Sequence, residues 1–126
     1  MAKVEIKDVQ EIRGFSTVKK VQNRAALLKD LKPNVILLFH GKEGQEMVVE
    51  IFTPDPNGDK TLPPAKVAAT KFVGAAEKVD NAYATLLFWA LKEGKLLGTP
   101  SREVYIKIDK NQDPPEVEVE VQSPLQ

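Results

Sequence analysis

The sequence has 126 residues, and 18 Lys and Arg are balanced by 18 Asp and Glu, which gives a formal net charge of zero. This length predicts one domain, and the neutral charge argues against direct nucleic-acid binding, which needs an excess of positive charge. The lack of cysteine excludes disulfides and thiolate chemistry, and a single histidine, His40, excludes any two-histidine site.

The chain shows no targeting or membrane-spanning segment. Its first ten residues are rich in charge, and the longest apolar run, residues 82–91, is too short to cross a bilayer. We therefore expect a cytoplasmic protein with no membrane partner.

The first half of the chain predicts one helix among strands. Apolar residues at helical spacing predict the helix, whereas short apolar runs bounded by Gly and Pro predict buried strands. In chain order, we expect an extended segment over 4–18, a helix over 21–31, strands over 35–39 and 47–52, and a Pro-rich loop over 53–64.

The second half repeats this order. We expect a strand over 66–73, a helix over 81–93 with Asp80 as its N-cap, and strands over 102–108 and 116–121. The helix is apolar all round near its middle, which predicts that it is covered on more than one side.

Two short matches support an internal duplication. The stretch EMVVEIFTP (46–54) matches EVEVEVQSP (116–124), and KVQN (20–23) matches KVDN (78–81) in the same order. We predict an α+β fold in which residues 1–126 form one domain of two βαββ units, about 1–56 and about 62–126. The units would share an antiparallel sheet with both helices on one face, related by a pseudo-twofold, and a ligand groove would lie between them.

Residues 72–126 resemble the second half of a GyrI-like small-molecule-binding domain, also called a tandem SHS2 or effector-binding domain. Residues 4–13 resemble the family's first strand, whereas residues 23–64 depart from it through a shorter first helix. The features that carry the resemblance are Gly74 at a strand end, Trp89 in the helix, Pro100 in the next loop, the Arg102-Glu103-Val104-Tyr105 strand, Pro114-Pro115 and Pro124.

The resemblance implies a pocket for bulky, often cationic aromatic compounds, lined by a Glu and several aromatic residues. Effector-binding domains of MerR-type multidrug regulators belong to this family. Some stand-alone members resemble gyrase-inhibiting proteins, others hydrolyse cyclopropane-containing compounds, and the fold resembles SOUL-type haem-binding proteins. The effector-like domain takes up the whole chain, so we expect a stand-alone member. A separate regulatory protein or a second copy of the chain would then be its candidate protein partner.

Glu103 and Tyr105 lie two residues apart and therefore share one face of a strand. We expect them in the open groove, with Val104, Ile106 and Ile108 facing the helices. Glu103 would supply charge for a cation, and Tyr105, Trp89, Tyr83 and Phe72 would form aromatic walls.

Other interpretations stay open. Glu103 could lie on a solvated strand face, beside further exposed carboxylates at Glu50, Glu118 and Glu120, and the aromatic residues could simply fill the core. Glu103 and Tyr105 could instead activate water in a cyclopropane-type hydrolase. A gyrase-inhibitor-like interaction protein is a third alternative. We expect no metal and no cofactor.

Overall fold

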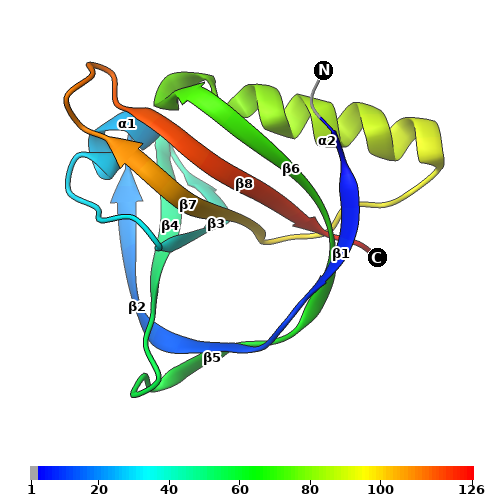
Figure 1. The fold of residues 1–126 in the computed structure, drawn as a ribbon, viewed down its shortest axis with the longest axis horizontal. Helices are drawn as coiled ribbons and strands as arrows, with labels where there is room; N and C mark the ends of the chain where they lie inside the picture. The colour runs from blue at the N-terminus through cyan, green and yellow to red at the C-terminus, as the bar shows by residue number, and fades with distance from the viewer. Residues whose placement is uncertain (1–2) are drawn as a thin grey trace.

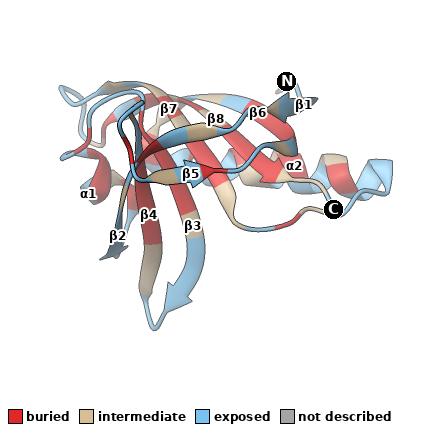
Figure 2. Ribbon diagram, turned by 90° about the horizontal axis from the view of Figure 1, so that it is seen from below, coloured by how far each residue is buried: buried red, intermediate tan, exposed pale blue. Residues whose placement is uncertain are grey.

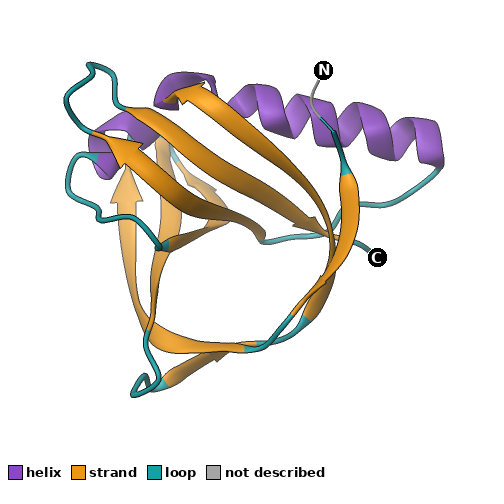
Figure 3. Ribbon diagram, in the orientation of Figure 1, coloured by secondary structure: helices purple, strands orange, loops and turns teal. Residues whose placement is uncertain are grey.

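A computed structural model describes residues 3–126, and across them eight strands form one antiparallel sheet accompanied by two α-helices. The strand order is β1-β6-β8-β7-β3-β4-β2-β5. The sheet curls strongly, and both helices lie on the same side of it (Figures 1 and 3). The α+β class and the antiparallel sheet are therefore confirmed. In chain order the elements are β1 (Glu5–Val9), β2 (Ile12–Val21), α1 (Arg24–Leu28), β3 (Ile36–Glu43), β4 (Glu46–Pro54), β5 (Lys60–Leu62), β6 (Ala65–Ala75), a 3₁₀ turn (Ala76–Lys78), α2 (Asp80–Glu93), β7 (Ser101–Asp109) and β8 (Glu116–Pro124).

The first helix is much shorter than the spacing predicted. Val21 belongs to β2, where it pairs with Met47 of β4, so the helix cannot begin before residue 24. Asn23 is its N-cap, and the Asn23 side chain accepts a hydrogen bond from the Ala26 amide at 2.8 Å. The extended segment predicted over 4–18 is likewise two strands, β1 and β2.

The second half follows the prediction closely. Its four predicted elements are β6, α2, β7 and β8, and the left-handed Gly94 (φ 67°) ends α2. The prediction that Asp80 is the N-cap is wrong. Asp80 is the first residue of α2, Val79 occupies the N-cap position, and no side chain caps the helix.

The Pro-rich loop contains a short strand that helps to curl the sheet. Strand β5 pairs with the first residues of β2, while the rest of β2 pairs with β4. Gly14 lies where these two pairings meet, and a Cβ atom there would be 2.2 Å from the Thr53 carbonyl oxygen. The absence of a side chain at Gly14 thus allows the close backbone approach where β2 passes from its pairing with β5 to its pairing with β4, and Figure 1 shows the strong curvature of β2.

Most residues of the central strands are buried (Figure 2), and their apolar side chains form one cluster on each face of the sheet. The larger cluster lies between the sheet and both helices, and it includes Leu28, Leu37, Val49, Leu86 and Val119. A smaller cluster covers the opposite face. It consists of Ile36, Leu38, Phe52 and Leu62. Where this smaller cluster lies, the face away from the helices is therefore covered rather than solvated.

The outer side of α2 is exposed in the isolated chain. Leu87, Phe88 and Leu91 are each more than half exposed, and Phe88 reaches 73%. The prediction that this helix is covered on more than one side is therefore wrong, because only its Ala82, Leu86 and Ala90 side packs on the sheet. Within residues 3–126, no helix has the length and hydropathy needed to cross a membrane.

The two halves of the chain contribute their long strands to the sheet in the same order. Each half runs strand, helix, strand, strand, and in each half the last strand lies between the first two. The halves join where β3 pairs with β7. The duplication itself stays a prediction.

Candidate functional site

Glu103 is the third residue of β7 and is completely buried between the sheet and the helices. The prediction that Glu103 and Tyr105 face an open groove is wrong, and so is the placement of Val104 toward the helices. Val104 packs against the cluster on the opposite face. Ile108 does face the helices, because the register shifts by one residue between Tyr105 and Lys107.

Four donors surround the Glu103 carboxylate, two on each oxygen. Oε1 accepts from Arg24 Nε at 2.9 Å and from Tyr105 Oη at 2.6 Å. Oε2 accepts from Arg24 Nη2 at 2.8 Å and from Tyr83 Oη at 2.5 Å. We call Glu103 and the three residues that donate to it, Arg24, Tyr83 and Tyr105, the Glu103 hub. The buried charge is paired and hydrogen-bonded, which is the condition for keeping an ionised carboxylate inside a protein.

Arg24 brings the positive charge into the hub from the first turn of α1. Its side chain is only 9% exposed, and its guanidinium lies over the Phe39 ring, 5.1 Å from the ring centre. The remaining nitrogen, Nη1, lies 3.4 Å from the carboxylate of Asp80, which is largely exposed. The guanidinium is thus a planar cation held between an aromatic ring and two carboxylates.

The hub shifts the pKa values of its members in ways that reinforce the network. Burial alone would lower the pKa of Arg24, but the charge and hydrogen bonds of Glu103 outweigh burial and raise it. Burial and the neighbouring Glu103 charge raise the pKa of both Tyr83 and Tyr105. Both phenols therefore stay protonated at neutral pH and act as hydrogen-bond donors.

A surface groove of about 490 Å³ opens beside the hub. Arg24 forms part of its lining, so the same side chain contacts the groove and the buried carboxylate. Two acidic side chains, Glu77 and Asp80, also line it. The complete lining is Gln22, Asn23, Arg24, Ala25, Met47, Glu77 and Asp80.

The structure brings together three of the five predicted site residues. Glu103, Tyr105 and Tyr83 meet in the hub. Trp89 and Phe72 pack partly buried against the main core, and neither lines the groove. They stay predicted wall residues that no contact links to the hub.

The sequence interpretation missed Arg24, which belongs to the hub, and Phe39, whose ring lies against the Arg24 guanidinium. A signal for Arg24 was present, since it precedes Leu28 by four residues and Leu31 by seven. At helical spacing this puts an arginine on the apolar stripe of the predicted helix, where a buried partner is needed. Phe39 carries no comparable signal.

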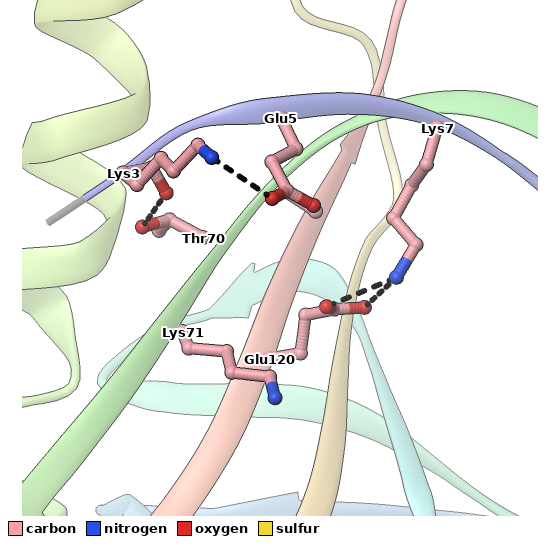
Figure 4. A pocket seen from close by; sticks show the side chains of 7 residues that line it. Lys3, Glu5, Lys7, Thr70, Lys71 and Glu120 are labelled. Carbon is pink, nitrogen blue, oxygen red and sulfur yellow. Dashed lines mark hydrogen bonds and ion pairs between the residues drawn. The ribbon is translucent and has the colours of Figure 1, made fainter.

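A second depression lies over β1 and the adjacent strands and is polar (Figure 4). Lys7 Nζ pairs with both oxygens of Glu120 at 3.1 Å, and Lys3 pairs with Glu5 at 3.7 Å. Lys3 and Glu5 are largely exposed, Lys7 is partly exposed and Glu120 is mostly covered, and such paired charges are typical of an ordinary protein surface. Among residues 3–126, no group of three His, Asp or Glu side chains is placed to hold a metal ion.

The fold and the hub define an α+β protein with a curled sheet and a buried, fully hydrogen-bonded carboxylate beneath its helices. No model of a known protein family and no curated sequence matches the chain. Solved structures do match it. The C-terminal domain of EcmrR superposes with a TM-score of 0.82 and 23% identity, over 100% of this chain and 98% of that one.

Two further matches extend this result. EcmrR in a complex with DNA gives a TM-score of 0.79 and 21% identity over 99% of this chain, which spans 57% of that one. A protein from Staphylococcus aureus assigned to bacterial transcription regulation gives 0.62 and 15% identity, over 98% of both chains. At these identities the matches show a shared fold. The expectation that this protein makes no direct contact with nucleic acid stays a prediction.

Proposed function

We propose that the protein reversibly binds small, amphipathic aromatic cations at the Glu103 hub. The single observation that carries this proposal is the position of the Arg24 guanidinium. It is a planar cation bonded to a buried carboxylate that also accepts from two tyrosines, with an aromatic ring on its face. A planar aromatic cation would find the same partners there: a negative charge, phenol groups and a ring for stacking.

In this proposal Arg24 is an exchangeable cation. Its Nη1 atom already lies near Asp80, and the Asp80 side chain borders the groove. When a ligand cation enters, Arg24 can therefore turn toward Asp80 and keep a carboxylate partner. Glu103 in turn keeps a positive partner, so that no buried charge is left unpaired at any stage.

The GyrI-like resemblance and the shared fold with the EcmrR C-terminal domain support a binding role over a purely structural one. The symmetric strand order supports the proposal that two βαββ units within residues 1–126 make up one ligand-binding domain. The groove beside Arg24 lies where the 22–25 segment of the first unit meets the start of α2 in the second.

A hydrolase is less well supported by the hub. A carboxylate has about four acceptor sites, and all four at Glu103 are taken by two arginine and two tyrosine donors. Glu103 therefore has no site left to accept a proton from water while these bonds hold. No contact in the structure favours a gyrase inhibitor over a binding protein.

Titration with ethidium, a fluorescent planar aromatic cation, tests the proposal. Ethidium should bind the wild-type protein saturably, and Glu103→Gln should weaken binding by about tenfold or more because the ion pair is lost. The matched control is Glu50→Gln, which removes a buried carboxylate from the opposite face of the sheet. Equal affinity in wild type and Glu103→Gln, with both proteins folded, would overturn the proposal.

A further inference from the structure

Another cleft, separate from the groove beside Arg24 and from the polar depression over β1, lies on the opposite face of the sheet from the Glu103 hub. Its volume is about 340 Å³, within the range of small-ligand sites. It is bounded by β3, β4, β5 and β7, by the loop before β7, and by the start of β6 and the end of β8. The lining residues are Leu38, His40, Glu50, Lys60, Thr61, Leu62, Pro63, Ala65, Thr99, Pro100, Arg102 and Pro124. Half of this lining is aliphatic or proline, and three side chains are basic.

Arg102 is the unusual member of this cleft. It is only 6% exposed, and its Nη2 donates to the Pro63 carbonyl oxygen at 3.0 Å. Its Nη1 is shielded from solvent and has no hydrogen-bond partner among residues 3–126. A buried donor without a partner is costly and rare in native proteins, and the cost is greater for a charged group.

The nearby carboxylates are already engaged by other residues. Glu50 pairs with Lys60 and bonds to His40 Nε2 at 2.9 Å. Glu120 accepts from Gln122 at 2.7 Å and pairs with Lys7. Arg102 forms an ion pair with neither of them. Burial lowers the pKa of its guanidinium, as expected where no anion offsets the loss of water.

We propose that this cleft binds a small organic carboxylate whose apolar body lies against Leu38, Leu62 and Pro100. The carboxylate would pair with Arg102, whose flexible side chain can bring Nη1 to the cleft surface. An arginine fork suits a carboxylate, and the apolar walls favour a ligand with a hydrocarbon body over a bare inorganic ion. This site is independent of the Glu103 hub, because the sheet separates the two.

Octanoate is a suitable probe, with octanamide and inorganic phosphate as comparisons. Titrated into the ¹⁵N-labelled protein, octanoate should shift the backbone amide signals of Leu38, Leu62 and Thr99 most strongly. Octanamide should bind much more weakly because it lacks the charge, and phosphate because it lacks the apolar body. Shifts centred elsewhere, or octanamide or phosphate binding as well as octanoate, would overturn the proposal.

Variants of Arg102 provide the second readout. Arg102→Gln should weaken octanoate binding by about tenfold or more, while the control Arg13→Gln, at an exposed arginine in β2, should leave it unchanged. Arg102→Met should raise the thermal midpoint of the ligand-free protein, because it removes the unpartnered donor, and should abolish stabilisation by octanoate. Octanoate binding that is unaffected by either variant would contradict the proposal. Neither variant alters the Glu103 hub, so ethidium binding reports separately on the proposed function.

Discussion

Replacing Arg24 by methionine would expose the energetic cost of the buried Glu103 charge. The variant keeps a long apolar side chain but removes two charge-assisted bonds, at 2.9 and 2.8 Å, from a carboxylate with no exposed surface. Breaking a buried ion pair from one side costs about 3–5 kcal/mol. For a chain of this size that corresponds to a fall in thermal midpoint of roughly 15 °C.

The single tryptophan, Trp89, packs against the main core and should report unfolding in urea by its fluorescence. The double variant Arg24→Met/Glu103→Gln should recover a large part of the loss, because its remaining hub has no unpaired charge. A loss of less than about 1 kcal/mol in the free energy of unfolding of Arg24→Met would refute the reasoning, because an ion pair that contributes so little behaves like a surface ion pair. The same variant should bind ethidium more tightly than wild type, because the competing cation is absent.

Three further predictions concern titration and packing. Tyr83 and Tyr105 are the only tyrosines, and their pKa values are raised in the folded protein. Tyrosinate absorbance should therefore stay flat above about pH 10 and rise only as the protein unfolds. A rise near pH 10 while the protein is still folded would contradict this. Burial alone would raise the pKa of Glu50, but its hydrogen-bond donors outweigh burial and lower it, so the folded state favours ionised Glu50. The free energy of unfolding of wild type should therefore exceed that of Glu50→Gln above pH 4.5, and this difference should shrink as the pH falls further. A difference that stays constant in urea unfolding across this pH range would disprove the prediction. Gly14→Ala should destabilise the protein by about 3 kcal/mol, because its Cβ would lie 2.2 Å from a backbone oxygen. In Gly98→Ala the tightest contact would be 3.3 Å to the flexible Gln126 side chain, and the nearest backbone oxygen lies at an ordinary 3.5 Å. Equal urea midpoints for the two variants would be the contrary result.

The order of the elements could be predicted because local pattern determines it. Alternation and apolar runs located β4, β6, β7 and β8, and Gly94 marked the end of α2. The length of α1 could not be predicted in this way. Its expected first residue, Val21, is held in the β2·β4 ladder by residues more than twenty positions away.

The strand faces were the harder problem. A period of two separates Glu103 and Tyr105 from Val104, but it does not say which set faces the helices when both faces of the strand are buried. Apolar residues were assigned to the helix side by default. The actual arrangement depends on Arg24, which lies 79 positions from Glu103 and supplies the positive charge that offsets the cost of burying the Glu103 carboxylate.

The pairing of Glu103 with Tyr105 and Tyr83 was nonetheless within reach of the sequence. The family resemblance pointed to the Arg102–Tyr105 strand, and Tyr83 lies on the helix that covers it. The missing element was a buried cation, and an arginine on an apolar helical stripe is the pattern that should prompt a search for a buried carboxylate partner.

The most direct measurement follows the Nε–H signal of Arg24 by NMR while ethidium is added to the protein. The chain contains three arginines, so the signal can be assigned by its loss in Arg24→Lys. If ligand and Arg24 compete for Glu103, the chemical shift or the water-exchange rate of this Nε–H should change with ethidium concentration. That change should follow the same saturation curve as ethidium fluorescence. Ethidium that saturates the protein while the Arg24 signal stays unchanged would contradict the central claim.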